Sequence, residues 1–404
     1  MRKKEKQWIY PRHTLVRKLV WPIFRHVVHL RYDLDIQHFR EPDRSQYLIL
    51  LNHQTPFDQF FIDMAFPAPI YYVATEDIFS LGWVSSVIRY LVAPIPIKKQ
   101  TNDLKAVVNC IRVAREGGTI AMAPEGNRTY SGRTEYMKPA VAKLAKKLGL
   151  PIVLFRIEGG YGAEPRWSDV IRKGKIKAYV SEVISPEEAS ALSDDALYTR
   201  IQQGLYVNEA CETGLYRHKN RAQYLERCVY VCPFCGLSEF ESHGHIVTCK
   251  QCGKQIIYGE DKRLQGIGYE FPFPYVAQWY DYQNDYINKL NSLEHVEQPL
   301  YRDQISLSEV LLYQRKVSLR KSCRAALYGD RVVIDEGTDN ELALPFSEIS
   351  AAACLGRNKL NLYHNDHVYQ FKGSKRFNSL KYVNLYFRHK NLTQGDPYGK
   401  FLGL

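Results

Sequence analysis

The sequence predicts an α/β domain, with a mixed, largely parallel sheet flanked by helices, followed by a small metal-binding module and a β-rich C-terminal domain. In residues 31–220, apolar runs alternate with amphipathic stretches, which is the order of strands and helices in an α/β layer. Residues 221–265 contain two CxxC pairs. Residues 266–310 begin as an aromatic- and Pro-rich stretch and become helical, and they connect to short strand-like runs over residues 311–404.

The chain as a whole is basic. Its 55 Lys and Arg residues outnumber 43 Asp and Glu residues, which gives a formal charge of +12. Such an excess favours polyanionic partners, either nucleic acid or an anionic membrane surface. The first residues lack the apolar core of a signal peptide, and no window reaches about 18 apolar residues without a charge. We therefore expect a cytoplasmic protein that is peripherally associated with a membrane.

Residues 1–30 form a basic, amphipathic N-terminal arm. Up to Arg31 the sequence holds nine Lys or Arg residues and one acid. Leu19, Trp21 and Phe24 lie among them at near-helical spacing. Two interpretations have equal weight: a helix that lies on anionic lipid headgroups, or a helix packed on its own domain with a solvated basic face.

Periodicity identifies several elements within residues 31–220. The expected strands are "YLILL", "PIYYVAT", "TIAMAP" and "GLPIVLFRIEG". The stretch "KPAVAKLAKKLG" predicts a helix that ends at Gly149. The apolar segment "SLGWVSSVIRYLVAPIPI" is either a surface through which a lipid enters or a buried core helix, and the second interpretation is favoured.

Chemistry-bearing residues follow the predicted strand at residues 47–51. Thr55 is suited to cap a helix that starts with Pro56. Asp58 in the first turn interacts favourably with the positive end of the helix dipole. His53 lies just before the helix, where the dipole favours a neutral ring, as a general base requires. The carboxylate of Asp58 is expected to hold one ring nitrogen and leave the other to take a proton from a hydroxyl.

A second polar stretch, Pro-Glu-Gly-Asn-Arg, follows the predicted strand at residues 119–122. In an open α/β sheet, ligands collect at the carboxyl ends of strands. Arg128 has a guanidinium that matches phosphate geometry, and Gly126 allows close backbone approach. Taken alone, the stretch is equally consistent with a polar turn that carries a surface salt bridge.

Four blocks in this order, "NHQTPFD", "APIPIKK", "APEGNR" and "GLPIVLFRIEG", resemble the glycerolipid acyltransferase family. This is the HX4D group, which contains the 1-acylglycerol-3-phosphate acyltransferases. The resemblance covers about residues 30–210. It implies that His53 is the base for attack of an acceptor hydroxyl on an acyl thioester, and that Asp58 orients His53. It implies no catalytic cofactor, because a thioester is already activated.

The resemblance also implies an acceptor site. Glu125, Gly126, Asn127 and Arg128 match the block associated with the acceptor's phosphate, and Lys98 ends the second block. Asn127 stands where Thr is commonest in the family, and Lys98 replaces an Arg, which removes a planar, bidentate phosphate contact. Both departures lie on the acceptor side and leave three acceptors open: lysophosphatidate, which the resemblance favours, glycerol 3-phosphate and another lysolipid.

The two CxxC pairs resemble a zinc ribbon. The expected metal ligands are Cys232, Cys235, Cys249 and Cys252. Two such pairs on a short hairpin suit tetrahedral thiolate zinc with a structural role. His243 and His245 are alternative ligands that four cysteines make unnecessary. Zinc ribbons often accompany nucleic-acid binding, but this one carries few charges and no basic–aromatic pattern, so a nucleic-acid partner is disfavoured.

The C-terminal part, residues 311–404, resembles a pleckstrin-homology or GRAM-type domain. Short strands separated by turns are followed by an expected helix over residues 377–388. Lys372, Lys375, Arg376 and Lys381 are a possible basic patch for anionic lipid, although a solvated face is favoured.

These observations together predict a peripheral-membrane acyltransferase of phospholipid biosynthesis. The enzyme would move a fatty acyl group from acyl carrier protein or coenzyme A to a lysophospholipid, and 1-acyl-sn-glycerol 3-phosphate would give phosphatidate. The alternative is a non-catalytic protein that keeps the acyltransferase fold and docks lipids or partners.

Overall fold

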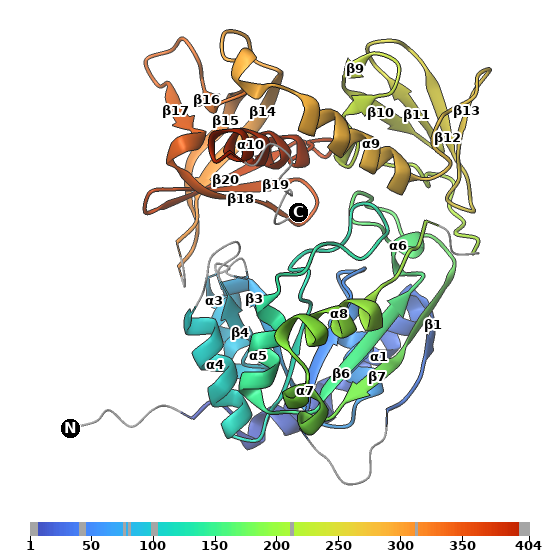
Figure 1. Ribbon diagram of the computed structural model, residues 1–404, viewed down its shortest axis with the longest axis vertical. Coiled ribbons are helices and arrows are strands. Elements are labelled where there is room, and N and C mark those ends of the chain that lie inside the picture. Colours follow the sequence, from blue (N-terminus) through green and yellow to red (C-terminus); the bar gives the residue numbers. More distant parts are fainter. Residues whose placement is uncertain are drawn as a thin grey trace. The chain divides into compact units, whose positions relative to one another are not determined.

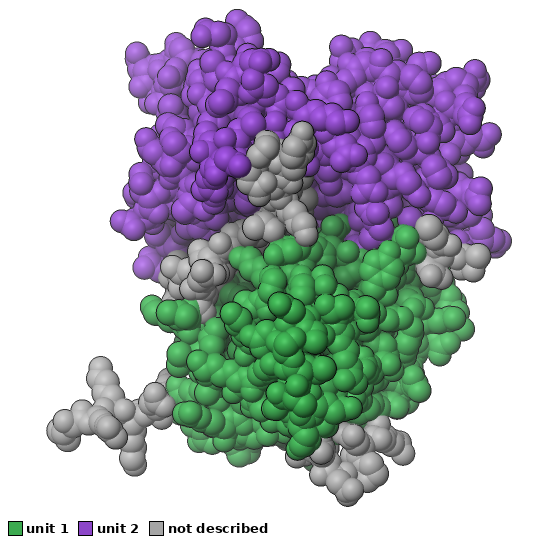
Figure 2. Space-filling view, in the orientation of Figure 1, with its two compact units in different colours: residues 1–128, 134–163, 174–209 green, residues 129–133, 164–173, 210–404 purple. Residues whose placement is uncertain are grey.

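The computed structural model describes residues 7–39, 46–75, 78–79, 82–97, 104–210, 214–311 and 314–395. The chain divides into two compact units (Figures 1 and 2). Unit 1 contains residues 1–128, 134–163 and 174–209, and unit 2 contains residues 129–133, 164–173 and 210–404. The two units are therefore not consecutive pieces of sequence, because two short segments from within the predicted α/β region belong to unit 2.

Unit 1 is built on a seven-stranded sheet with the order β1-β7-β6-β2-β5-β3-β4. Its strands are β1 (Asp33–Ile36), β2 (Leu48–Leu51), β3 (Ile70–Thr75), β4 (Ile95–Ile97), β5 (Thr119–Met122), β6 (Ile152–Glu158) and β7 (Lys175–Ile184). All neighbouring pairs run parallel except β6 and β7. The sheet is thus mixed and largely parallel, as the sequence predicted.

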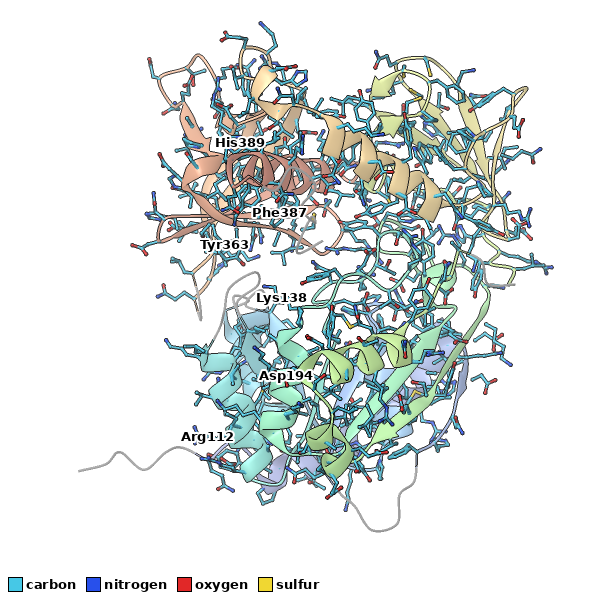
Figure 3. The ribbon with its side chains drawn as sticks, viewed as in Figure 1. Arg112, Lys138, Asp194, Tyr363, Phe387 and His389 are labelled. Carbon is cyan, nitrogen blue, oxygen red and sulfur yellow. The ribbon has the colours of Figure 1, made fainter. Side chains whose placement is uncertain are left out.

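Helices cover the sheet of unit 1 on both faces (Figure 1). They are α1 (Pro11–Arg31), α2 (Asp58–Ala65), α3 (Trp83–Leu91), α4 (Leu104–Arg115), α5 (Ala140–Leu148), α6 (Gly160–Ala163), α7 (Pro186–Ala191) and α8 (Asp194–Leu205). Helix α5 packs between α4 and α8, and Lys146 of α5 pairs with Asp194 at the start of α8 at 2.8 Å. Asp194 is labelled in Figure 3. Helix α5 ends at Gly149, which adopts a left-handed conformation (φ 63°) as expected.

Strand β2 lies at the centre of the sheet and is buried on both faces. Leu48 and Leu50 belong to the core shared with α4, α5 and α8, while Ile49 and Leu51, also buried, alternate with them along the strand. A strand covered on both faces requires a continuous apolar run, and the sequence "LILL" supplies it. The four predicted strands correspond to β2, β3, β5 and β6.

The prediction of a buried core helix in the segment "SLGWVSSVIRYLVAPIPI" is wrong. This segment forms α3 and β4, and Ser85 is the one buried residue within α3. Trp83 is 78% exposed and Tyr90 is 61% exposed. Amphipathic periodicity defines an apolar side of a helix but does not determine what covers that side.

Unit 2 contains two small sheets near the cysteine pairs. Strands β8 (Val231–Cys232) and β9 (Gly236–Leu237) form a two-stranded hairpin. A four-stranded antiparallel sheet follows, with β10 (Phe240–His243), β11 (Ile246–Cys249), β12 (Gln255–Tyr258) and β13 (Leu264–Gly266). Helix α9 (Val276–Lys289) comes next, and its Trp279 donates a hydrogen bond to the carbonyl of Val231 at 2.7 Å.

A seven-stranded antiparallel sheet forms the rest of unit 2, with the order β17-β16-β15-β14-β20-β19-β18. Its strands are β14 (Tyr301–Glu309), β15 (Val317–Leu327), β16 (Arg331–Ile334), β17 (Leu342–Pro345), β18 (Ile349–Leu355), β19 (Lys359–His364) and β20 (His367–Gly373). Helix α10 (Leu380–Thr393) ends the described part of this unit. The expected order of strands and then a helix is observed, while the pleckstrin-homology likeness stays a prediction. Strand β14 lies inside the stretch expected to become helical.

Residues 164–173 are held in unit 2 by buried arginines. Arg166 donates to the carbonyl of Cys354 at 3.0 Å, and Arg227 pairs with Asp169 at 2.7 Å. Both arginines are 2% exposed. A buried guanidinium is tolerated when its donors are satisfied, so these bonds fix residues 164–173 within unit 2.

We expect His389, which is labelled in Figure 3, to make the stability of the protein depend on pH. Burial lowers the pKa of His389, and Asp330 and a hydrogen bond with Gly329 oppose this shift. The unfolded state therefore takes up the proton more readily, and stability is lost as the pH falls below about 6.5. Replacement His389→Gln should reduce the slope of unfolding free energy between pH 7 and 5, measured by urea denaturation.

The control for this experiment is His243→Gln, because the side chain of His243 is 75% exposed. It should leave the slope unchanged. A slope in His389→Gln equal to that of the parent would contradict the assignment.

Candidate active site

The predicted catalytic residues lie where two parallel neighbours of the sheet end. Strands β2 and β5 pair in register, with Leu50 opposite Met122. His53 follows β2 by two residues, and Glu125 follows β5 by three. Since the carboxyl ends of parallel strands meet at one edge, the two polar stretches found in the sequence come together there.

The carboxylate of Asp58 holds this turn together. Its Oδ1 accepts from the amide and the hydroxyl of Thr55, at 2.9 and 2.6 Å. Its Oδ2 accepts from the amide of Gln54 at 2.7 Å and contacts Nδ1 of His53 at 2.8 Å. Asp58 is 1% exposed, so these partners replace the water that a buried carboxylate would lose.

His53 is oriented by Asp58 and remains partly exposed. Its side chain is 29% exposed, while that of Asp58 is 1% exposed. An ionised Asp58 accepts from Nδ1–H, which leaves the lone pair on Nε2 of a neutral ring. This arrangement of a base and its orienting acid is what abstraction of a hydroxyl proton requires.

Helix α2 begins at Asp58, two residues later than predicted. The hydroxyl of Thr55 accepts from the amide of Phe57 at 3.1 Å while donating to Asp58. These bonds hold residues 55–57 in a turn, and therefore Thr55 does not act as the cap of a helix that starts at Pro56.

Glu125 is buried beside the same turn. Its Oε1 accepts from the amide of His53 at 2.8 Å, and its Oε2 accepts from the amide of Glu135 at 2.7 Å. Burial raises the pKa of Glu125 well above its usual range, although the hydrogen bonds from Glu135 and His53 oppose this shift. Both oxygens of the carboxylate therefore have main-chain partners.

The other predicted acceptor-site residues follow Glu125 along the chain. Gly126 is exposed and has φ 71°, a conformation that glycine adopts without strain. Asn127 is buried and Arg128 is partly buried. Lys98 lies outside the described residues. Roles of these residues in binding an acceptor stay predictions.

The sequence did not reveal two residues that fix the geometry of the turn. Asn52 bonds with its amide group to both main-chain groups of Ile157 in β6, at 2.7 and 2.8 Å. Gln54 accepts from the amide of Tyr161 at 2.7 Å. Both residues lie within "NHQTPFD", but their partners are more than 100 residues away. The signal available in the sequence was two amide side chains directly after a buried strand.

The four predicted cysteine ligands come together in unit 2. Their Sγ atoms lie within 4.8 Å of one another, with Cys232 and Cys252 at 3.8 Å and Cys235 and Cys249 at 3.6 Å. A tetrahedral zinc with Zn–S bonds of about 2.3 Å places sulfurs about 3.8 Å apart. The cluster therefore fits a metal ion such as zinc. Four thiolates would close the coordination shell, which is typical of a structural site.

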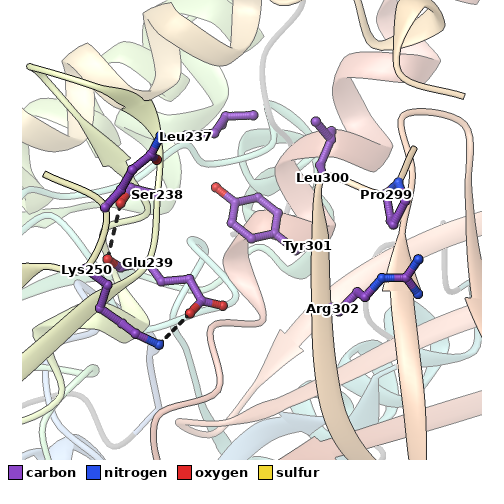
Figure 4. Close-up of a pocket in the computed structure, with 9 residues that line it drawn as sticks. Leu237, Ser238, Glu239, Lys250, Pro299, Leu300, Tyr301 and Arg302 are labelled. Carbon is purple, nitrogen blue, oxygen red and sulfur yellow. Dashed lines mark hydrogen bonds and ion pairs between the residues drawn. The ribbon is translucent and has the colours of Figure 1, made fainter. Parts of the chain in front are cut away.

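Unit 2 also contains a pocket of about 490 Å³ (Figure 4). It is lined by residues 237–239, Lys250, Gln251 and residues 299–302, and Lys250 pairs with Glu239 at 2.9 Å. None of the predicted catalytic or acceptor-site residues lines it.

Residues 35–158 match a protein-family model described as Acyltransferase. Among curated proteins, the chain is 28% identical over 118 residues to a 1-acyl-sn-glycerol-3-phosphate acyltransferase of Borreliella burgdorferi, covering 28% of this chain and 47% of that protein. It is 24% identical over 117 residues to a chloroplastic 1-acyl-sn-glycerol-3-phosphate acyltransferase, BAT2, of Brassica napus, covering 29% of this chain and 33% of that protein. The match therefore spans a third to a half of the length of these relatives.

Among solved structures, a match is the 1-acyl-sn-glycerophosphate acyltransferase PlsC from Thermotoga maritima. It has a TM-score of 0.41 and 21% identity, and covers 51% of this chain and 80% of that chain. The matched region of the family model, residues 35–158, contains the turn at His53 and the stretch at Glu125.

We expect the purified protein to carry one tightly bound zinc ion per chain, measured by inductively coupled plasma mass spectrometry. Replacement Cys252→Ser should reduce the zinc content at least tenfold and lower the unfolding temperature by on the order of 10 °C, because metal binding contributes directly to folding free energy. The matched control His243→Ala should keep both values, since four thiolates complete the site. Equal zinc in Cys252→Ser and the parent would contradict the ligand set.

Proposed function

Because residues 35–158 match the acyltransferase family, we propose that this protein transfers a fatty acyl group from an acyl thioester to the hydroxyl of a glycerolipid acceptor. The observation that carries the proposal is the 2.8 Å contact between Nδ1 of His53 and Asp58. It lies inside the matched region, at the carboxyl end of a central strand, with the ring partly exposed.

The proposed reaction begins with the acceptor hydroxyl beside Nε2 of His53. The ring takes the hydroxyl proton as the oxygen attacks the thioester carbonyl, and Asp58 stabilises the imidazolium that forms. The tetrahedral intermediate then collapses, the carbon–sulfur bond breaks, and the proton passes from His53 to the leaving thiolate. The products are an ester and a free thiol, and His53 returns to its neutral form.

The proposed acceptor is 1-acyl-sn-glycerol 3-phosphate, which would give phosphatidate. The curated relatives carry this activity in their names, and Arg128 provides a cation two positions beyond a glycine in the stretch that follows β5. The proposed donors are acyl carrier protein or coenzyme A thioesters. Zinc at the four cysteines is proposed as a structural ion, since its ligands belong to unit 2.

We also propose that the enzyme works on the surface of an anionic membrane. No helix within the described ranges is long and apolar enough to cross a bilayer. Along α1, exposed apolar residues recur at helical spacing, and those of α3 add to them. We define the α1–α3 apolar face as Leu15, Leu19, Ile23, Val27, Leu30, Trp83, Val87 and Tyr90.

Contacts hold α1 against the rest of unit 1 while this face stays exposed. Arg12 donates to the carbonyl of Tyr90 in α3 at 2.9 Å, and the rings of Trp21 and Phe24 stack on Phe60. Lys18 and Arg25 are exposed on the same helix. An apolar face flanked by cations suits insertion among anionic headgroups. Binding to lipid headgroups and packing on its own domain, the two interpretations of the N-terminal arm, are thus compatible. One side of α1 packs on the rest of unit 1, and another side is exposed.

The alternative function is non-catalytic docking of a lipid or partner on an acyltransferase fold. A docking protein would not require the buried Asp58 to orient a partly exposed His53. The two functions differ in a direct assay of product formation.

We expect the purified protein to form phosphatidate from lysophosphatidate and an acyl thioester, followed by mass spectrometry. Replacement His53→Ala should lower kcat by at least 1,000-fold, because the hydroxyl would lose its base. The control His26→Ala changes an exposed histidine of α1 and should retain activity. Product from His53→Ala at the parental rate would contradict the base assignment, and no product from any donor and acceptor pair would favour docking.

We expect the double variant Leu19→Glu, Ile23→Glu to bind vesicles of anionic phospholipid at least tenfold more weakly than the parent, measured by sedimentation. Each change removes apolar burial of about 1–2 kcal/mol and adds a repelled charge. The matched control Leu215→Glu, Leu293→Glu changes two exposed leucines of unit 2 and should bind as the parent does. Equal loss in both variants would assign the effect to net charge and contradict a specific role for the α1–α3 apolar face.

A further inference from the structure

The turn that carries His53 is held by two buried acids. Three consecutive amide groups, those of His53, Gln54 and Thr55, donate to carboxylate oxygens. Gln54 and Thr55 donate to Asp58, and His53 donates to Glu125. Asp58 therefore fixes the ring and the later part of the turn, while Glu125 fixes the main chain at His53 itself.

Glu125 is held on its other side as well. Its second oxygen accepts from the amide of Glu135. The neighbouring Thr134 is anchored where α8 ends, since its hydroxyl donates to the carbonyl of Leu205 at 3.0 Å and its amide donates to the carbonyl of Val207 at 3.0 Å. Glu125 thus connects the His53 turn to a segment that is itself fixed to a helix end.

These contacts disagree with a role for Glu125 in binding a phosphate. A phosphate is bound by hydrogen-bond donors and cations, whereas the two oxygens of Glu125 accept from the amides of His53 and Glu135. Glu125 is also 7% exposed, and main-chain amides already occupy both of its oxygens.

We propose that Glu125 is a positioning residue that holds the main chain at His53, and is not a ligand of the acceptor's phosphate. This inference rests on the proposed function, because the position of His53 matters for the rate only if His53 is the base. The hydrogen bond from the His53 amide to Glu125 fixes where the imidazole ring stands when it takes the hydroxyl proton. Its loss should therefore lower kcat and leave acceptor binding largely unchanged.

Two variants of Glu125 separate the length of the side chain from its two accepting oxygens. Glu125→Gln keeps the size but has one accepting oxygen and one donating NH2 group, so one of the two main-chain amides faces a donor. Glu125→Asp keeps the carboxyl group but is one methylene shorter and cannot hold both amides. The control Glu188→Gln changes an acid that caps α7 by accepting from the amide of Ser185 at 2.9 Å.

We expect both Glu125 variants to lower kcat by on the order of 100-fold while KM for lysophosphatidate changes by less than about threefold. Arg128→Ala serves as the comparison for a phosphate contact, in which KM rises. A tenfold or greater rise of KM with kcat retained in the Glu125 variants would overturn the proposal.

A second measurement needs no activity. Nitrogen-15 NMR of histidine side chains in the unliganded protein reports which ring nitrogen of His53 carries the proton, with the signal assigned by its absence in His53→Asn. The signal should shift or split in Glu125→Gln and Glu125→Asp, and stay in place in Glu188→Gln. An unchanged His53 signal in the folded Glu125 variants would overturn the positioning role. If the parent forms no product, the proposed function fails, but the NMR comparison still tests whether Glu125 positions His53.

The parent chain supplies a third measurement that does not depend on the folding of a variant. Hydrogen exchange of the His53 and Glu135 amides is followed with and without saturating glycerol 3-phosphate. Unchanged protection supports the proposal, because Glu125 keeps both amides. Loss of protection at both amides when the phosphate compound binds would overturn it.

Discussion

The buried carboxylate of Asp58 is the constraint on which the candidate site depends. A charge enclosed by protein must have its lone pairs filled by donors, and here the donors come from three consecutive residues, His53 to Thr55. This requirement folds the chain after β2 into a tight turn and delays the start of α2 to Asp58. The ring of His53 then has a fixed direction, because its Nδ1 is one of the donors.

The order of the strands supplies the other half of the site. Strand β2 lies between β5 and β6, so the residues that follow it can contact the ends of both neighbours. Asn52 bonds to Ile157 of β6, and His53 bonds to Glu125 beyond β5. The turn is therefore held from both sides of a central strand, which is a rigid position for groups that must meet a substrate.

Unit 2 depends on a different set of buried polar contacts. Arg166 and Arg227 bind residues of the C-terminal sheet and of the segment at residues 164–173. Guanidinium groups at such depth need several acceptors. Main-chain carbonyls provide them and, for Arg227, so does the carboxylate of Asp169. The four cysteines add a second cluster that a metal ion such as zinc would complete. Unit 2 is thus specified by long-range polar contacts as well as by its apolar core.

The sequence by itself determined what is local. The apolar run at residues 48–51, the helix that ends at Gly149, the spacing of the four cysteines and the pairing of His53 with Asp58 depend on residues close together in the chain, where periodicity and side-chain reach are sufficient. Only the tertiary structure decided what depends on distant neighbours. The motif around Glu125 predicts a phosphate ligand. In the structure its oxygens accept from the main-chain amides of His53, beyond the end of β2, and of Glu135. The sequence of helix α3 predicts a core helix, but its Trp83, Val87 and Tyr90 are exposed within the described part of the chain. The physical reason is that a sequence pattern defines the polarity of each face, while strand order and packing determine which partner that face meets.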